Sequence, residues 1–416
     1  MKVLVVGGGG REHALVWKLS QSPGVDQIYC APGNAGTAQI AANIPLSDND
    51  IPGLLEFALD NSVGLTVVGP EVPLVNGIVD VFEGVGLRIF GPNARASILE
   101  GSKVFTKELL VKYKIPTAEF HRFTEADTAK AFLRSNTVFP IVIKADGLAA
   151  GKGVLIIHSL EEAEKGIEEI MEDRVFGDAG NEIIIEEFLT GPELSMLCFV
   201  DNKTVVPMGS AKDYKRIGEG DTGLNTGGMG AISPNPLYDQ ELEDYCLTNI
   251  IEPSLAGMRA EGRPFKGILY CGIMLTESGP KVLEYNVRFG DPETQVILPR
   301  LKTDLVHIFE AIIDDRLNEV DVIWDDQTAA TVVLASGGYP ESYPKGLTIT
   351  GLEQVTGSTT FHAGTKNDGD VVITSGGRVL TITSIARTVA EALTLSYDNA
   401  RKIEFEGKTL RTDIGS

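Results

Sequence analysis

The stretch that decides the fold lies at the start of the chain and reads KVLVVGGGGREHA over residues 2–14. An apolar run enters four consecutive glycines, and the residues after them open a helical pattern. Three further apolar runs end in Gly or Pro and alternate with helical stretches, with strands expected at 28–30, 65–68 and 87–90 and helices at 11–21, 53–60 and 73–83. Strands that alternate with helices form right-handed βαβ units, so we predict a doubly wound parallel sheet over residues 1–101.

The glycine turn between the first strand and the first helix is a candidate anion site. Backbone N–H groups and the positive end of the helix dipole attract an anion there, and glycine lets a phosphate approach closely. The dinucleotide pattern GxGxxG fails because Glu12 stands at the third glycine position. We therefore expect a sugar phosphate rather than NAD, with a turn that binds nothing as the alternative. The residues expected to line this substrate site are Gly8, Gly9, Gly10, Asn34, Gly36, Thr37, Pro70 and Glu71.

A second glycine-rich stretch reads KADGLAAGKGV over residues 144–154. It differs from a P-loop because it is one residue too short and carries Gly153 where Ser or Thr would hold magnesium. The pattern instead predicts a hairpin between two strands, whose Lys144 and Lys152 could fold over a triphosphate. Lys103 is a third candidate for a phosphate contact, and a solvated hairpin without a ligand is the alternative reading.

The stretch KVLEYNVRFGDPE, residues 281–293, carries the candidate metal site. Side chains alternate along a strand, so we expect Glu284, Asn286 and Arg288 on one face and Leu283, Tyr285 and Val287 on the other. Two oxygen ligands beside a guanidinium suit Mg²⁺ that bridges phosphates, with the arginine steadying transferred charge. Asp291 and Glu293 add carboxylates. A half-exposed strand with an internal ion pair is the alternative.

Two more segments are candidates for binding. An apolar strand, Ile183–Phe188, runs into a hinge whose backbone could bond an adenine edge, and Glu193 could accept ribose hydroxyls; an edge strand with acidic ends is the alternative. A charged cluster at 212–216 precedes what we expect to be a long glycine-rich loop reaching Gly230, and a loop of that length inside a compact domain is usually functional or mobile.

Composition excludes several classes of protein. The net charge of −22 disfavours binding to nucleic acid or anionic membranes, which need excess Lys and Arg. The four cysteines form no CxxC pair, so we expect neither a zinc site nor a disulfide framework, and a cytoplasmic location. No apolar run reaches the ~20 residues of a membrane helix. The 416 residues divide into a sheet at 1–101, a linker helix with a small α+β unit at 102–190, a core at 191–325 and a small α+β domain at 326–416.

These motifs together resemble the phosphoribosylamine–glycine ligases, also called glycinamide ribonucleotide synthetases, a family of the ATP-grasp superfamily. The similar stretches follow the family's order: GGGGREHA at 7–14, PGNAGTA at 32–38, VVGPE at 67–71, LEGSK at 99–103, KADGLAAGKGV at 144–154, GDTGLNTGGMGA at 220–231, NVRFGDPETQ at 286–295 and RTDIG at 411–415. The resemblance implies an α/β and α+β multidomain fold, with 102–190 as the ATP-grasp lid and 191–325 as the ATP-grasp core.

The resemblance also implies a reaction. ATP would phosphorylate the carboxylate of glycine, and the amine of 5-phosphoribosylamine would attack the glycyl phosphate, giving glycinamide ribonucleotide, ADP and phosphate in purine biosynthesis. The implied catalytic residues are Arg288, Asp291, Asp213 and Lys215, and the implied metal ligands for Mg²⁺ or Mn²⁺ are Glu284 and Asn286. The implied ATP contacts are Lys103, Lys144, Gly151, Lys152, Glu186, Glu187, Leu189 and Glu193.

Other readings compete with this one. Another ATP-grasp carboxylate–amine ligase or carboxylase, a dehydrogenase and a non-catalytic nucleotide-binding protein are the alternatives. The family often has histidine at position 214, where this chain has Tyr214, and glutamine at position 212, where it has Lys212. A titratable role at position 214 is therefore not expected. The partners implied are small molecules, with neither nucleic acid nor membrane, and we expect a monomer, with a dimer as the alternative.

Overall fold

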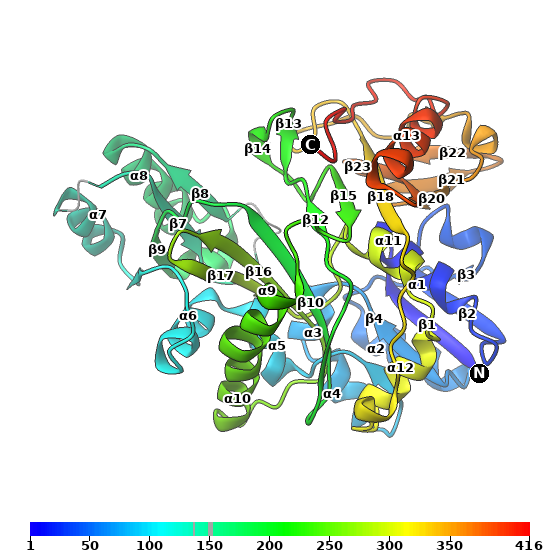
Figure 1. Cartoon of the computed structure of the whole chain (residues 1–416), viewed down its shortest axis with the longest axis horizontal. Coiled ribbons are helices and arrows are strands. Elements are labelled where there is room, and N and C mark those ends of the chain that lie inside the picture. The colour runs from blue at the N-terminus through cyan, green and yellow to red at the C-terminus, as the bar shows by residue number, and fades with distance from the viewer. Residues whose placement is uncertain (136–137, 149–152) are drawn as a thin grey trace.

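The computed structural model describes residues 1–135, 138–148 and 153–416. A parallel sheet in the order β3-β2-β1-β4-β5 forms the N-terminal part, as the sequence predicts (Figure 1). Its strands are β1 Lys2–Gly7, β2 Gln27–Pro32, β3 Ala42–Asn43, β4 Leu65–Val68 and β5 Ile89–Phe90. Its helices are α1 Gly10–Leu19, η1 Thr37–Gln39, α2 Ile51–Asp60, α3 Glu71–Val75, α4 Ile78–Glu83 and α5 Ala94–Gly101. The single helix expected at 73–83 is wrong, because Gly77 takes a φ of +86° and separates α3 from α4.

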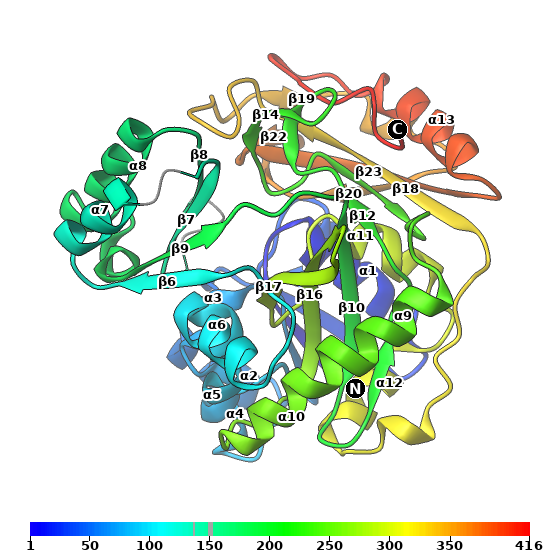
Figure 2. The same ribbon diagram turned by 60° about the vertical axis from the view of Figure 1, so that its left-hand side comes forward.

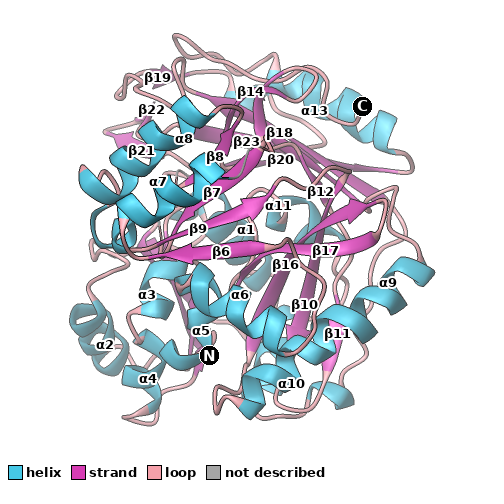
Figure 3. Cartoon of the chain, turned by 90° about the vertical axis from the view of Figure 1, so that its left-hand side faces the viewer, coloured by secondary structure: helices cyan, strands magenta, loops and turns pink. Residues whose placement is uncertain are grey.

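The lid is an antiparallel sheet in the order β6-β9-β7-β8, reached through helix α6 Lys103–Lys112. Its elements are β6 Phe120–Phe123, α7 Ala126–Ser135, β7 Ile141–Ala145, β8 Val154–Ile157, α8 Leu160–Ile167, η2 Glu168–Glu172, η3 Gly177–Asn181 and β9 Ile183–Glu187. Helices α7 and α8 lie together over the sheet (Figure 3), and one apolar cluster joins them to it. Strand β6 and helix α7 were not expected from the sequence.

The core is an antiparallel sheet in the order β11-β10-β16-β17. Its elements are β10 Glu193–Val200, β11 Val205–Pro207, α9 Gln240–Cys246, η4 Leu247–Ile251, α10 Glu252–Ala260, β16 Gly267–Thr276, β17 Gly279–Asn286, α11 Thr294–Ile297, η5 Leu298–Arg300, α12 Leu305–Ile313 and η6 Leu317–Glu319. Helices α9 and α10 cover one face of the sheet (Figure 2), and α12 packs with residues of the other face and of the N-terminal sheet. The core sheet is therefore buried on both faces.

Strand β17 departs from the expected alternation of side chains. Gly272 of β16 pairs with Glu284, but the next residue, Ile273, pairs with Val282, so a bulge leaves Leu283 without a direct partner. Val282 and Tyr285 face the buried cluster, whereas Leu283 is only partly buried and lines a cleft. The expectation that Leu283 shares one face with Tyr285 and Val287 is thus wrong.

The C-terminal part is built on an antiparallel sheet in the order β12-β15-β18-β23-β20, with a three-stranded sheet β19-β22-β21 beside it. Its elements are β12 Lys212–Asp213, β15 Gly230–Ser233, β18 Thr328–Ala335, β19 Thr348–Ile349, η7 Leu352–Gln354, β20 Thr359–His362, β21 Thr365–Asp368, β22 Val371–Thr374, β23 Arg378–Ala386 and α13 Val389–Ala400. Strands β12 and β15 come from before residue 325, so this sheet spans the division that the sequence predicts there.

The expectation of a long loop after the charged cluster is wrong. Residues 216–225 form a hairpin of two short strands, β13 Arg216–Gly218 and β14 Thr222–Asn225, and β15 follows. Gly220, in the turn between these strands, has a φ angle of +63°, so glycine here serves a tight turn. In the part of the chain that the structure describes, no helix has the length and apolar character needed to span a bilayer.

Candidate active site

One large cleft of about 940 Å³ opens between the lid, the core sheet and the C-terminal part. The predicted site residues that line it are Glu71, Lys103, Lys144, Glu186, Glu187, Leu189, Glu193, Asp213, Lys215, Glu284, Asn286, Arg288 and Asp291. The predicted residues Gly151 and Lys152 lie outside the described residues. Segments distant in the sequence thus bring most of the predicted side chains into a single space.

Two lysines converge on Glu186 at the lid side of the cleft. Lys144 Nζ lies 3.0 Å and Lys107 Nζ 3.2 Å from Glu186 Oε2, and all three side chains are buried. Burial lowers the pKa of Lys107 to about 8, although Glu186 draws it upward. Lys103 Nζ donates to the Gly147 carbonyl over 2.8 Å. Lys107 was not predicted, since a lysine inside a helix carries no sequence signal of burial.

An apolar slot adjoins these lysines. Val142, Val154 and Ile156 of the lid line the cleft together with Met274 and Leu283 of the core. Leu189, at the predicted hinge, packs in a small cluster that contains Ala118 and Met274. The slot can accept a flat apolar ring, with lysines at one end to meet negative charge. Glu187 and Glu193, also predicted here, pair with Lys281 and Lys215 over 2.8 and 2.7 Å.

Glu284 and Asn286 project from the end of β17 toward the cations. Burial pushes the pKa of Glu284 upward, but Lys215, Lys144 and Lys103 outweigh burial, so the pKa lies below its ordinary value. An ionised Glu284 beside the Asn286 amide offers two oxygen ligands, which is the donor set that Mg²⁺ uses when substrate phosphates and water complete its coordination. Among the described residues, no group of three or more His, Cys, Asp or Glu could hold a metal by itself. The donors fit a metal shared with a nucleotide.

Arg288 is held from several sides. Its Nε lies 3.2 Å from Glu71 Oε2, and its Nη2 lies 3.0 Å from Glu100 Oε1 and donates to Asn286 Oδ1 over 3.1 Å. The Val287 N–H also donates to Glu100 Oε2, over 2.7 Å. Burial raises the pKa of Glu100 to about 7 against the attraction of Arg288. Glu100 belongs to the LEGSK motif, but its contacts with Val287 and Arg288 were not predicted.

A second group of buried charges surrounds Asp213. Its Oδ1 is buried and has no hydrogen-bond partner. Burial and the carboxylate of Glu293 raise the pKa of Asp213 well above its ordinary value. Tyr214, next in the chain, is buried in the C-terminal part with Ile232 and Ile414. Position 214 is therefore not among the residues that line the cleft.

Arg378 is a residue of the C-terminal part whose side chain lines the cleft. This residue begins β23, and its Nη2 lies 3.3 Å from Asp291 Oδ2 while Nη1 donates to the Asp291 carbonyl over 2.7 Å. The amide of Gln295 donates to Asp291 Oδ1 over 2.7 Å. Burial pushes the pKa of Asp291 upward, but Arg378 and Arg11 outweigh it and hold the pKa below its ordinary value. Arg378 was missed, although two glycines precede it in the sequence.

The predicted substrate residues of the N-terminal turns lie beside the cleft lining rather than in it, apart from Glu71. The Asn34 amide donates to the carbonyls of Gly8 and His362 over 3.0 and 2.8 Å, and Thr37 Oγ1 donates to Asn43 Oδ1 over 2.8 Å. These side chains hold the turns together. The remaining members, Gly9, Gly10, Gly36 and Pro70, belong to the same turns, and their role in binding stays a prediction.

The glycine turn is partly occupied by the protein's own carboxylate. Glu12 Oε2 accepts the Gly9 N–H over 2.6 Å, and Glu12 Oε1 lies 2.6 Å from Arg11 Nε. A methyl group on Gly9 would lie 3.5 Å from Asp291 Oδ2, so the turn directly adjoins the segment that carries Asp291. His13 is buried and accepts the His362 N–H over 2.8 Å; burial and His362 lower its pKa to about 3. A neutral, bonded His13 has a structural role.

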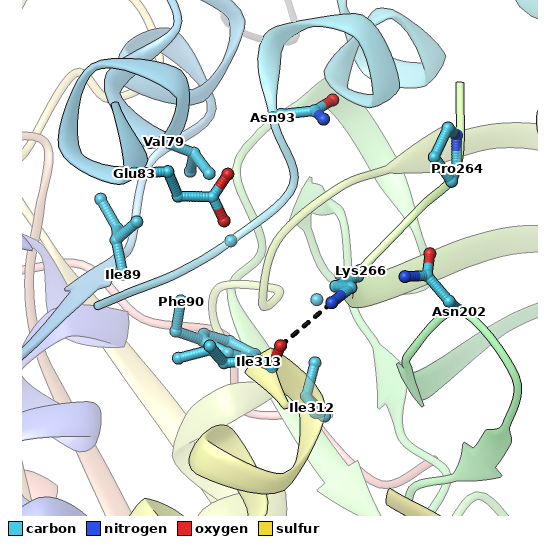
Figure 4. Close-up of a pocket in the computed structure, with 12 residues that line it drawn as sticks. Val79, Glu83, Ile89, Phe90, Asn93, Asn202, Pro264, Lys266, Ile312 and Ile313 are labelled. Atoms are coloured by element: carbon cyan, nitrogen blue, oxygen red, sulfur yellow. Dashed lines mark hydrogen bonds between the residues drawn. The ribbon is translucent and has the colours of Figure 1, made fainter. Parts of the chain in front are cut away.

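A smaller cavity of about 160 Å³ lies where β5 and α4 meet the core sheet (Figure 4). Glu83 and Asn93 border it on one side, and Lys266 borders it on the other. Lys266 is already engaged, because its Nζ donates to the Ile313 carbonyl over 3.0 Å and lies 2.9 Å from Asp315. The cavity shares no lining residue with the large cleft.

Comparisons with known proteins bear on the whole chain. Residues 1–100, 101–294 and 329–416 match the family models described as phosphoribosylglycinamide synthetase N domain, ATP-grasp (A) domain and C domain. The phosphoribosylamine–glycine ligase of Escherichia coli (strain K12) is 51% identical over 421 residues, covering 100% of this chain and 98% of that protein. The enzyme of the same name from Caldanaerobacter subterraneus is 50% identical over 416 residues and is covered completely.

Solved structures agree with these relatives. The crystal structure of a phosphoribosylamine–glycine ligase from Thermotoga maritima superposes with a TM-score of 0.85 at 34% identity, covering 99% of this chain and 100% of that one. A biotin carboxylase domain from Hydrogenobacter thermophilus superposes with a TM-score of 0.75 at 17% identity, covering 98% of this chain and 91% of that chain, which shows a common fold only.

The lid and core sheets, with a cleft between them that lysines, arginines and carboxylates line together, define an ATP-grasp enzyme, a class that binds ATP together with a divalent metal ion. Within that class, the chain belongs to the phosphoribosylglycinamide synthetase family.

Proposed function

We propose that this chain is an ATP-dependent ligase that joins glycine to 5-phosphoribosylamine in purine biosynthesis. A carboxylate oxygen of glycine attacks the γ-phosphorus of ATP, the bond to the bridging oxygen breaks, and ADP leaves. The amine of phosphoribosylamine then attacks the carbonyl carbon of glycyl phosphate. The carbon–oxygen bond to phosphate breaks, inorganic phosphate leaves with the proton that the amine gives up, and glycinamide ribonucleotide remains. Family membership supports this assignment.

Different parts of the cleft suit different parts of ATP. The apolar slot of Val142, Ile156 and Met274 suits adenine, and the backbone near Leu189 can meet its polar edge. The lysines at positions 103 and 144 then face the phosphates, and the further predicted contacts Gly151 and Lys152 lie outside the described residues. Lysine is a strongly hydrated point charge that suits phosphate. Glu186, Glu187 and Glu193 complete the predicted set.

Glu284 and Asn286 would hold Mg²⁺ or Mn²⁺ together with the nucleotide phosphates. When bound, the metal neutralises charge on the phosphates and helps to orient the γ-phosphoryl group. The chain's own contribution is Arg288, which Glu71 and Glu100 hold beside these donors over 3.2 and 3.0 Å. A guanidinium fixed in this way can stabilise charge that develops on the transferred group without rearranging first.

Asp213 and Asp291 are the carboxylates we assign to the amine-bearing substrates. The buried, unpartnered Oδ1 of Asp213 can accept a hydrogen bond from the ammonium group of glycine. Such a bond would relieve the cost that burial imposes on the Asp213 carboxylate. Lys215 pairs with Glu193, and its positive charge acts against the rise in the pKa of Asp213. The Lys215 ammonium group can bind the carboxylate of glycine. Asp291 adjoins the glycine turn, where the sugar phosphate would bind.

The observation that carries the proposal is that Lys103, Lys144, Lys215 and Glu284 line one cleft, in which the three lysines hold the pKa of Glu284 below its ordinary value. The test is a coupled assay of ADP release in which ATP, glycine, phosphoribosylamine or Mg²⁺ is left out in turn. We expect ADP release only when all four are present. ATPase activity of equal size without glycine would refute the ligase assignment. Substitution of Mn²⁺ for Mg²⁺ in the same assay decides the metal preference.

Two further assignments belong to this proposal. We propose that the enzyme works as a monomer in the cytoplasm, since one chain supplies every part of the cleft described above. Sedimentation at micromolar concentration distinguishes a monomer from a dimer.

A further inference from the structure

The last six residues of the chain, Arg411–Ser416, form what we call the C-terminal clasp. The clasp lies against hairpin β13–β14 and strand β12, almost two hundred residues earlier in the sequence. Its RTDIG motif contributes no residue to the lining of the cleft. The clasp nevertheless contacts the segment that carries Asp213 and Lys215.

Arg411 is the centre of the clasp and is only 2% exposed. Its Nη1 donates to Asp221 Oδ1 over 2.7 Å and to the Arg216 carbonyl over 3.1 Å, so it bonds the turn of the hairpin and the first residue of β13. Its Nε and Nη2 donate to the two carboxylate oxygens of Asp413 over 2.8 and 2.7 Å. A bidentate pair of this kind fixes the plane of the guanidinium.

Other clasp residues bond the same region. Asp413 Oδ2 accepts the Gly220 N–H at the tip of the hairpin over 2.8 Å, and Thr412 Oγ1 donates to Glu219. The Ser416 carbonyl accepts a hydrogen bond from Lys212 Nζ over 3.0 Å. The clasp therefore contacts the tip of the hairpin and also strand β12, which precedes the hairpin in the chain.

The hairpin needs such support because it has little of its own. All four residues of β14, Thr222–Asn225, are exposed, and the pairing with β13 is irregular. A two-stranded hairpin without an apolar face is marginally stable in water. Yet Arg216, Asp221 and Asn225 line the cleft, so the position of the hairpin sets one wall of the site.

We propose that the C-terminal clasp positions this wall for catalysis, with Arg411 as its main positioning residue. Arg411 acts through Asp221 and the Arg216 carbonyl and does not touch substrate. The inference rests on the proposed function, because the wall matters only if the cleft performs the ligation. The predicted ATP contacts lie on the lid and core, so loss of the clasp affects the use of glycine and phosphoribosylamine rather than binding of the nucleotide.

The experiment compares Arg411→Lys and Asp413→Asn with the wild-type enzyme. Lysine keeps the charge of Arg411 but cannot bond Asp221, Asp413 and the Arg216 carbonyl in one plane. Asn keeps an acceptor for the Gly220 N–H and removes the charge opposite Arg411. The matched control is Asp398→Asn, since Asp398 also pairs with an arginine, over 2.8 Å, but is exposed and remote from the cleft lining.

We expect kcat/KM for glycine and for phosphoribosylamine to fall about tenfold in both clasp variants, as a small misplacement of positioned groups can cause. ATP affinity, measured by calorimetry without the other substrates, stays within about twofold, and Asp398→Asn matches the wild type. Adding Asp221→Asn to Arg411→Lys should cause no further loss, since the link is already broken.

Three results overturn the inference. Wild-type kinetic constants with only a lower melting temperature would mean that the clasp merely stabilises the C-terminal part. Equal losses for ATP and glycine would mean a general disturbance of the fold. Full additivity with Asp221→Asn would mean that Arg411 does not act through the hairpin. A wild-type enzyme without glycine-dependent ADP release would instead refute the proposed function, so the two failures are distinguishable.

Discussion

Glu100 gives the sharpest test of how the charges around Arg288 are balanced. Its side chain is 8% exposed, its two oxygens bond Val287 and Arg288, and burial raises its pKa to about 7 from an ordinary 4.5. A difference of this size corresponds to about 3 kcal/mol between the two protonation states. We therefore expect Glu100→Gln, which removes the ionisation and keeps an acceptor for the Val287 N–H, to make the folded chain more stable at alkaline pH.

The sign follows from proton linkage. Below pH 4.5 the carboxyl group is protonated in both the folded and the unfolded chain and contributes no pH dependence. As the pH rises from 4.5 to about 7, the unfolded chain releases this proton while the folded chain retains it, so the folded state loses stability. Above about 7 the loss is complete and constant. Between pH 5 and 8 the wild type should therefore lose about 2–3 kcal/mol relative to Glu100→Gln.

Urea unfolding of both proteins at pH 5, 6, 7 and 8 measures this difference. Glu108→Gln is the control, because Glu108 lies on the neighbouring helix α6 with 54% of its side chain exposed and should shift stability by less than about 0.5 kcal/mol at each pH. A difference between wild type and Glu100→Gln that is constant over this range, or that reverses, would refute the reasoning. Turnover should fall in the same variant, because Arg288 loses one of the two carboxylates that hold it.

Three further predictions concern other parts of the cleft. Lys107→Met should lower the free energy of unfolding by about 1–3 kcal/mol, measured in urea, because Glu186 loses one of its two buried lysine partners and keeps Lys144. Arg378→Met should lower kcat about 100-fold and leave ATP affinity by calorimetry unchanged, because Asp291 loses its guanidinium partner. Tyr214→Phe should leave kcat/KM within about twofold in the ADP-release assay, because its hydroxyl makes only a 3.4 Å bond outside the cleft.

Controls for these variants come from exposed pairs. Lys112→Met breaks a pair with Glu261, but the lysine is 63% exposed, so a loss above about 1 kcal/mol would show that burial is not the cause at position 107. Arg401→Met is the control for Arg378→Met, since Arg401 is 72% exposed and pairs with Asp398. A tenfold fall in kcat/KM for Tyr214→Phe would show that its hydrogen bond to Ser416 of the C-terminal clasp matters for turnover, against the expectation.

The sequence was most informative where chemistry and local pattern coincide. The apolar runs ending in glycine predicted the parallel sheet because each feature is local. A glycine-rich stretch predicted Lys144, the alternation of side chains along a strand predicted Glu284 and Arg288, and the structure brings all three to one cleft. Leu283 departs from the alternation expected for β17, since a bulge depends on how the partner strand pairs and leaves no signal in a single strand.

Residues that act across long separations escaped the sequence analysis for a similar reason. Glu100 bonds Val287, and Arg378 bonds Asp291, but the intervening segments decide whether these groups meet. The glycine-rich segment after Arg216 was read as a loop, because glycines that permit a tight hairpin turn look the same as glycines in an irregular segment. The hairpin is defined by its contacts with the C-terminal clasp, which only the folded chain contains.

The net charge of −22 and a site for phosphates are compatible because the two belong to different parts of the surface. The described residues that line the cleft include ten carboxylates and nine cationic side chains, a difference of one, so nearly the whole acidic excess lies elsewhere. Inside the cleft the cations already have partners, as Lys144 has Glu186 and Arg378 has Asp291. Carboxylates thus hold lysine and arginine in place before a phosphate arrives. The protein bears the cost of ordering these side chains on folding, so the nucleotide meets groups that are already positioned.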